Sequence, residues 1–158
     1  NGRVAANRWP CLYRLGNCYW RAHAIGARMI RRIIIEAVAQ EDMRPPYNQD
    51  KEGGDWIIDG DTITVRSIGE DFENWQQPET FLYALHELIE CMLCRKAGIS
   101  QEQVDRFDVA HEYMQDHLPD AQPGDHPASP YRLQHRRACL IEFLVADMLG
   151  IVGYGRME

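Results

Sequence analysis

Residues that favour β-strands gather in three short segments in the first half of the chain. The segment 30–39 is rich in β-branched side chains, which favour strands over helices. Two further segments, 55–58 and 62–68, flank Asp59-Gly60-Asp61, and Asp-Gly between two apolar runs is typical of a β-hairpin. In the second arm apolar and polar residues alternate, as expected for a strand with one buried face. We therefore predict three strands, of which the last two form a hairpin.

The second half of the chain has helical patterns instead. Pro78 precedes a predicted helix over 79–97 and Gly98 follows it, which is the usual distribution of proline and glycine around a helix. At 100° per residue this helix has one apolar stripe. The stripe is predicted to consist of Phe81, Leu85, Leu88, Ile89 and Met92.

Two more helices are predicted after the first. Ser100 and Gln103 have the spacing of a capping box at the start of a helix over 101–117. A proline-rich loop over 119–130 separates it from a third helix over 130–149. After Arg137 this third helix is apolar nearly all round, which predicts burial on both sides. Three strands followed by three helices define an α+β fold with a small antiparallel or mixed sheet.

The chain length of 158 residues suits a single domain with its own core. Residues 1–28 lack clear periodicity and are predicted to be an N-terminal extension, in which a helix across Tyr19–Met29 is one interpretation. The clean pattern starts at Met29, so we place the single α+β domain, with its metal site, at 29–158.

Composition excludes some classes of function. A net charge of −7 and a pI of about 5.3 argue against nucleic-acid binding, which needs clustered positive charge. The apolar runs are only a few residues long, whereas a membrane span needs about 20. Five cysteines, an odd number, favour small core residues in a reducing compartment. We expect a cytoplasmic protein of a bacterial or phage-infected cell.

The strongest chemical signal is His86-Glu87-Leu88-Ile89-Glu90 in the first predicted helix. His86 and Glu90 are four residues apart, so they lie one turn apart on the same side of the helix. The spacing is that of the His-Glu-x-x-His helix of metalloproteases, with Glu90 in place of the second histidine. A carboxylate is an accepted zinc ligand and also suits manganese or magnesium. In the related motif, the position of Glu87 supplies the general base.

A third ligand is expected from another helix. His135 and Glu142 are seven residues apart on one face of the third helix, and a buried glutamate needs an ion pair, a hydrogen bond or a metal. We predict His135 as the third ligand, with Asp108 or His111 as the next choices. His111 lies in the middle of an apolar stripe, where a histidine that only completes the core is the competing interpretation.

Two further expectations concern the surroundings of the site. Asp125 and His126 are weaker candidate ligands because they lie in the proline-rich loop, and loops position ligands poorly. We expect Glu142 or Asp108 to accept a hydrogen bond from a ligand imidazole.

Together these segments resemble the minimal zincin-like metallopeptidases, and more narrowly a group of small bacterial and phage proteins. The resemblance covers about residues 30–150. It implies a zincin-like fold, ligand roles for His86 and Glu90 and a base role for Glu87, although Glu90 stands where the peptidase pattern has histidine. The residues that carry it are Gly54-Asp55-Trp56, Asp59-Gly60-Asp61-Thr62, Ala84-Leu85-His86-Glu87-Leu88-Ile89-Glu90, and Pro130-Tyr131 with His135.

The sequence therefore predicts a metal-dependent hydrolase of peptidase or amidase type, which uses metal-activated water on a peptide or small amide. The alternative is a non-enzymatic, phage-encoded domain that binds a protein partner and holds a structural metal or none. Substrate, metal identity and oligomeric state stay open at this level.

Overall fold

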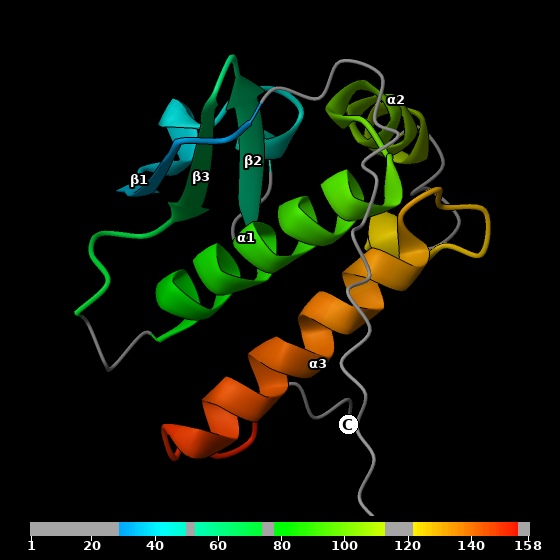
Figure 1. Ribbon diagram of the computed structural model, residues 1–158. Helices are drawn as coiled ribbons and strands as arrows, with labels where there is room; N and C mark the ends of the chain where they lie inside the picture. The colour runs from blue at the N-terminus through cyan, green and yellow to red at the C-terminus, as the bar shows by residue number, and fades with distance from the viewer. Residues whose placement is uncertain (1–28, 50–52, 74–77, 113–121, 155–158) are drawn as a thin grey trace, which may run out of the picture.

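The computed structural model describes residues 29–49, 53–73, 78–112 and 122–154, and it has the α+β architecture that the sequence predicts (Figure 1). The predicted extension over 1–28, where a helix is one interpretation, lies outside the described residues, as does the C-terminal part of the second predicted helix. Within the described ranges, every helix is too short or too polar to cross a bilayer. The elements are β1 (Arg32–Val38), β2 (Gly54–Asp59), β3 (Thr62–Ile68), α1 (Glu79–Ala97), α2 (Gln101–Glu112) and α3 (Arg132–Met148), with short 3₁₀ turns η1 (Gln40–Asp42), η2 (Tyr47–Gln49) and η4 (Pro123–Asp125).

The sheet is mixed and has the strand order β1-β3-β2. The hairpin prediction is confirmed, because β2 and β3 pair antiparallel with Trp56 opposite Val65. β1 pairs parallel with β3 on its other side. The central strand β3 therefore carries the fully buried residues of the described sheet, Ile63, Val65 and Ser67.

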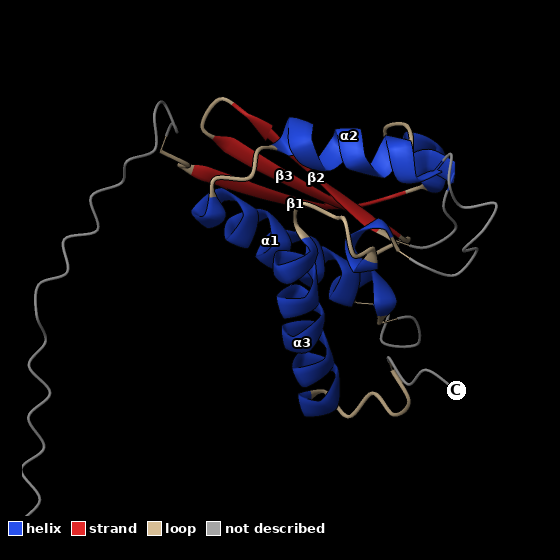
Figure 2. Cartoon of the chain, turned by 90° about the vertical axis from the view of Figure 1, so that its right-hand side faces the viewer, coloured by secondary structure: helices blue, strands red, loops and turns tan. Residues whose placement is uncertain are grey.

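α1 lies between the sheet and α3, so the domain has three layers (Figure 2). Its bounds agree with the prediction, and Gly98 ends it in the left-handed conformation. The predicted apolar stripe is wrong, however, since Met92 is 47% exposed while Cys91 and Cys94 are completely buried. Small side chains occupy the contacts with the sheet because they allow the helix to approach it closely, and a pattern based on large aliphatic residues misses them. The core cluster consists of Trp56, Ile63, Val65, Ala84, Cys91, Cys94, Val104 and Tyr131.

α3 is the outer layer and buries only one face. The prediction that it is buried on both sides is wrong for the described chain, because Leu140, Leu144 and Met148 on its opposite face are 68%, 58% and 76% exposed. Packing against α1 along a single face explains the difference. The buried face consists of Gln134, His135, Ala138, Glu142 and Ala146.

A network of charged side chains joins the loop after β1 to the sheet and to α2. Arg44 donates two hydrogen bonds to the buried Asp55 of β2, at 2.5 and 2.8 Å. The same guanidinium donates to both carboxylate oxygens of Asp105 on α2, at 2.8 and 3.0 Å. Charge-assisted bonds of this fork geometry are strong and directional. They fix α2 relative to the edge strand β2.

Asp108 continues this network toward α3. Its carboxylate accepts a hydrogen bond from Tyr47 at 2.8 Å and one from Tyr131 at 2.5 Å. Tyr131 is the residue that precedes the first turn of α3. Asp108 thereby positions the start of the helix that carries His135.

The protonation of Asp108 should be visible in the pH dependence of stability. Burial raises the pKa of Asp108 to about 6, against the hydrogen bonds of Tyr131 and Tyr47, which lower it. An aspartate in an unfolded chain has a pKa of about 3.9. The folded protein thus binds this proton more tightly. Binding of this proton therefore contributes fully to the free energy of unfolding below about pH 4, and this contribution is lost as the pH rises through about 6.

We expect the substitution Asp108→Asn to remove this pH-dependent contribution to the free energy of unfolding. Relative to the variant, the wild type should lose about 2 kcal/mol of unfolding free energy between pH 4 and pH 6.5, because most of the pKa difference of about two units, at about 1.4 kcal/mol each, is expressed in this window. Urea unfolding at a series of pH values measures it. Asp42→Asn changes an exposed aspartate and serves as the control. Parallel profiles for wild type and Asp108→Asn would rule this explanation out.

Candidate metal centre

Two neighbouring helices bring four ionisable side chains together in the interior. α1 contributes His86 and Glu90, and α3 contributes His135 and Glu142. All four are buried, with exposed fractions of 7%, 4%, 4% and 6% in that order. The pair at i and i+4 on α1 thus faces α3, and the structure places the predicted residues His86, Glu90 and His135 side by side.

Three donor atoms of this cluster form a small triangle. His86 Nε2 lies 3.1 Å from His135 Nδ1, which lies 3.0 Å from Glu90 Oε2. The third side, from Glu90 Oε2 to His86 Nε2, is 3.5 Å. Zinc bonds of about 2.0–2.1 Å in tetrahedral geometry separate neighbouring donors by about 3.3 Å. The triangle therefore has the dimensions needed to hold one zinc ion or an ion of similar size.

Each imidazole is also held at its other nitrogen. His86 Nδ1 makes a 2.7 Å contact with Glu142 Oε2, so the carboxylate fixes the ring with Nε2 turned toward the triangle. His135 Nε2 lies 3.6 Å from the sulfur of Cys139. An outer partner of this kind selects the tautomer of a ligand histidine and orients its ring.

The carboxylates of the cluster favour a positive charge on its two histidines. Burial opposes a charged His86, but hydrogen bonds with Cys139, Glu142 and Glu90 raise its pKa above the ordinary value. In the same way, burial acts against the charge of His135, while Cys139 and Glu90 raise its pKa to about 10. Burial tends to raise the pKa of Glu90, yet the two histidines lower it to about 2.

The ring nitrogens of His86 and His135 that face each other limit how many protons the two histidines can carry. A proton on both His86 Nε2 and His135 Nδ1 would point two N–H groups at each other across 3.1 Å. At most one proton fits between them. A metal ion at this place would instead accept both lone pairs, and Glu90 would supply a negative ligand beside it. The indole of Trp56 donates a 3.3 Å hydrogen bond to the other oxygen of Glu90, which fixes that carboxylate.

Glu87, the predicted base, lies on the next position of α1 and is half-buried against β2. A Cβ atom at Gly54 would come within 2.5 Å of Glu87 Cγ, so the glycine leaves room for this side chain. Burial raises the pKa of Glu87 well above its ordinary value, and the charge of Glu90 adds to the increase. His86 and His135 act in the opposite direction. The carboxylate is therefore electrostatically coupled to the triangle.

Cys139 is the residue of this region that the sequence analysis missed. Its sulfur and one donor atom each of His86 and His135 lie within 4.8 Å of one another, so these three residues form a second candidate donor set. Burial acts against the thiolate, but hydrogen bonds with His135 and His86 lower its pKa to about 7. The i, i+4 spacing of His135 and Cys139 on one helix was the signal available in the sequence.

The other candidates lie apart from the triangle. Asp108 is bound to two tyrosines, as described above. His111 is 1% exposed, and its ring packs against that of His126 with 5.5 Å between centroids. Asp125 Oδ2 comes no closer than 4.0 Å to His135 Nε2, the nitrogen that points away from Glu90. Of the predicted outer partners, Glu142 contacts a ligand histidine.

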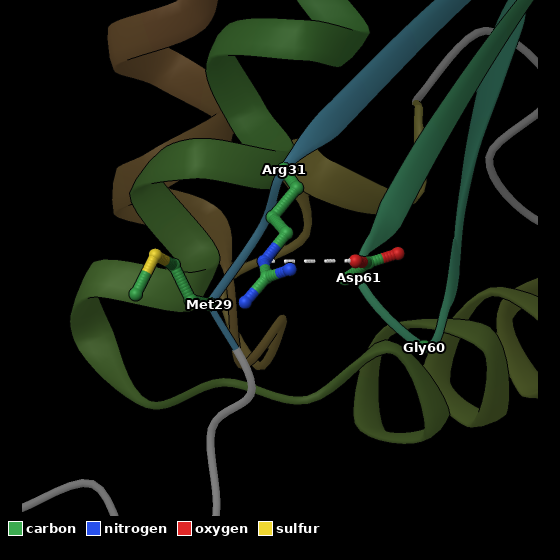
Figure 3. A pocket seen from close by; sticks show the side chains of 4 residues that line it. All are labelled: Met29, Arg31, Gly60 and Asp61. Carbon is green, nitrogen blue, oxygen red and sulfur yellow. Dashed lines mark ion pairs between the residues drawn. The ribbon is translucent and has the colours of Figure 1, made fainter.

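A shallow hollow elsewhere on the surface is unrelated to this cluster (Figure 3). It is lined by Met29, Arg31, Gly60 and Asp61, at the start of β1 and the turn of the hairpin. Arg31 and Asp61 are 4.0 Å apart and both are largely exposed, so their ion pair contributes little.

Comparison of the chain with family models, with curated proteins and with solved structures gives no match. The zincin-like resemblance therefore stays a prediction. The function has to be argued from the geometry of the site.

The loop before α3 supports the ring of His135 from behind. A Cβ atom at Gly124 would lie 2.3 Å from Cγ of His135, which no ordinary contact allows. We expect Gly124→Ala to lower the unfolding free energy by about 1–3 kcal/mol through overpacking. In a His135→Ala background, which removes the ring, the same substitution should be nearly neutral.

Chemical denaturation of the four proteins in this double-mutant cycle measures the coupling. His126→Ala, which removes another ring of the same loop, provides a control background in which Gly124→Ala should keep its full effect. Equal effects of Gly124→Ala in the wild-type and His135→Ala backgrounds would contradict the close contact.

Proposed function

We propose that this protein binds a divalent metal ion, zinc in the first place, and hydrolyses a peptide or small amide bond with it. The single observation that carries the proposal is the triangle of His86 Nε2, Glu90 Oε2 and His135 Nδ1, with sides of 3.0–3.5 Å. Three protein donors are the usual number for a catalytic zinc, which keeps its fourth position for water or substrate.

The donor set supports hydrolysis. Two imidazoles and one glutamate are also the ligands of catalytic zinc in peptidases of the His₂Glu type. In those sites one helix supplies both histidines, whereas here α1 supplies one histidine and the glutamate. The ion would supply Lewis acidity, which activates water and polarises the carbonyl of the substrate.

The remaining roles belong to side chains of this chain. Glu87 would accept a proton from the attacking water and deliver it to the leaving amine. Glu142 holds the ring of His86 through Nδ1, and Trp56 holds the free oxygen of Glu90. These contacts keep the donors in place before any ion binds, which lowers the reorganisation that binding requires.

A second candidate is a structural metal in a non-catalytic, protein-binding domain. The proximity of Cys139 to both histidines favours it, since a sulfur donor added to the triangle would close the coordination sphere. Against it, the sulfur contacts His135 at Nε2, while Nδ1 of the same ring faces Glu90. One imidazole cannot offer both nitrogens to a single ion.

Metal analysis tests the binding proposal directly. The purified wild type should hold about one zinc ion per chain and regain it after removal by a chelator. His86→Ala and Glu90→Gln should each lower the affinity at least about tenfold, because each removes one of three ligands. His126→Ala, which changes a half-buried histidine of the loop before α3 outside the triangle, should retain the ion. Sub-stoichiometric metal unaffected by His86→Ala would remove the basis of the proposal.

Catalysis is tested at Glu87. We expect Glu87→Gln to retain the metal and to lower the rate of hydrolysis of a mixed fluorogenic peptide library by about 10²–10⁴, the usual contribution of a general base. The exposed Glu70→Gln is the matched control. A zinc-loaded wild type without hydrolytic activity, or a fully active Glu87→Gln, would favour the structural alternative.

Cobalt substitution distinguishes the two donor sets. If Cys139 stays outside the coordination sphere, the cobalt protein should lack a thiolate-to-cobalt charge-transfer band, and Cys139→Ser should leave its visible spectrum nearly unchanged. A charge-transfer band that disappears in Cys139→Ser would instead indicate four protein ligands and a closed site.

A further inference from the structure

The carboxylate of Glu142 has a partner on each of its two oxygens. Oε2 is in contact with His86 Nδ1 at 2.7 Å, and Oε1 accepts a hydrogen bond from the hydroxyl of Tyr154. Glu142 is 6% exposed, so bulk water does not compensate for the loss of either partner. The chain of contacts runs from the C-terminal turn through Glu142 to the ring that contributes Nε2 to the triangle.

The chain after α3 is folded so that Tyr154 points back at this helix. The helix ends in a turn in which the amide of Ile151 donates to the carbonyl of Ala146 at 3.0 Å. Gly150 and Gly153 both adopt positive φ angles, 75° and 89°, and reverse the direction of the chain. The ring of Tyr154 then packs edge-on against Phe143 with 6.1 Å between centroids.

The hydroxyl of Tyr154 remains a donor over the neutral pH range. Burial, followed by its hydrogen bond and charge interaction with Glu142, raises the pKa of the phenol above its ordinary value. The phenol therefore keeps the proton that it donates to Oε1 of Glu142.

We propose that Tyr154 is a positioning residue of the metal site, which locks the carboxylate of Glu142 so that Glu142 in turn locks the ring of His86. This inference rests on the proposed metal-binding function. The terminal torsion of a glutamate is soft and has no sharp preferred value. A carboxylate held at one oxygen can therefore rotate, whereas one held at both oxygens keeps a single orientation.

The consequence is that residues 149–154, which contribute no donor to the triangle, determine part of its affinity. Removal of an outer partner of a ligand histidine usually lowers metal affinity or activity 10–100-fold. Tyr154 acts one step further out, through Glu142. We expect about a tenfold loss of affinity when its hydroxyl is removed.

The experiment compares Tyr154→Phe with Tyr47→Phe. The first keeps the ring on Phe143 and removes only the hydroxyl on Glu142. The second removes a similar tyrosine–carboxylate bond, of 2.8 Å to Asp108, and leaves intact the bond from Tyr131 to Asp108 that positions the start of α3. Zinc affinity is measured by competition with a chromophoric chelator. In the metal-free proteins, NMR measures the exchange with water of the His86 Nδ1 proton.

Tyr154→Phe should weaken zinc binding about tenfold and speed the exchange of the His86 Nδ1 proton, while Tyr47→Phe should leave both at the wild-type values. Zinc binding by wild type and Tyr154→Phe with equal affinity would overturn the role of Tyr154 and leave the metal site intact. Equal losses in the two variants would show a general structural effect and also overturn it. Failure of the wild type to bind zinc would overturn the metal site itself, and the role of Tyr154 with it.

Discussion

Buried ionisable groups join α1 to α3, and the position of α3 depends on this contact. Each of the four side chains would be costly to bury alone, because water is lost from a charge or a strong hydrogen-bonding group. Together they pair across the interface, with Glu142 on His86 and Glu90 on His135. Such a contact permits one register of the two helices, since a shift of one turn would leave several groups unpaired.

This constraint links the charge of the cluster to the position of α3. The helix is held on one face only, and its apolar residues on the opposite face make no comparable contact within the described chain. A cation bound at the triangle, as we propose, would neutralise Glu90 and use both lone pairs of the facing histidines. Binding it should therefore stabilise the packing of α3 as well as the site, in the way that metal binding and folding are coupled in small domains.

The sequence predicts the elements well because each has a local signal. The Asp59-Gly60 turn defines the hairpin, and the amide of Ser100 donates to Gln103 Oε1 at 2.9 Å, as one half of a capping box requires. The parallel pairing of β1 with β3 has no such signal, since it joins segments that are distant in the chain. The apolar stripe of α1 was misjudged because Ala84, Cys91 and Cys94 carry the contact instead of larger residues.

Part of the candidate site could be predicted from ionisable residues at positions where the sequence pattern predicts burial. The spacing of His86 and Glu90 indicates a shared face, and Glu142 on an apolar helix calls for a partner. Cys139 was missed because a cysteine on such a face is usually a small core residue. The contribution of Tyr154 depends on two successive turns after α3, which no periodicity encodes.

In the proposed site α1 would supply one histidine and the glutamate, whereas one helix supplies both histidines in peptidase sites of the His₂Glu type. A metal ion responds to the donor atoms and their directions, and the order of the residues along the chain is irrelevant to it. The two histidines turn different nitrogens inward, Nε2 from α1 and Nδ1 from α3. Because Nδ1 is next to Cγ, a ring that uses it brings its own backbone closer to the triangle. The ring of His135 then needs a neighbour without a side chain behind it, and Gly124 occupies that place.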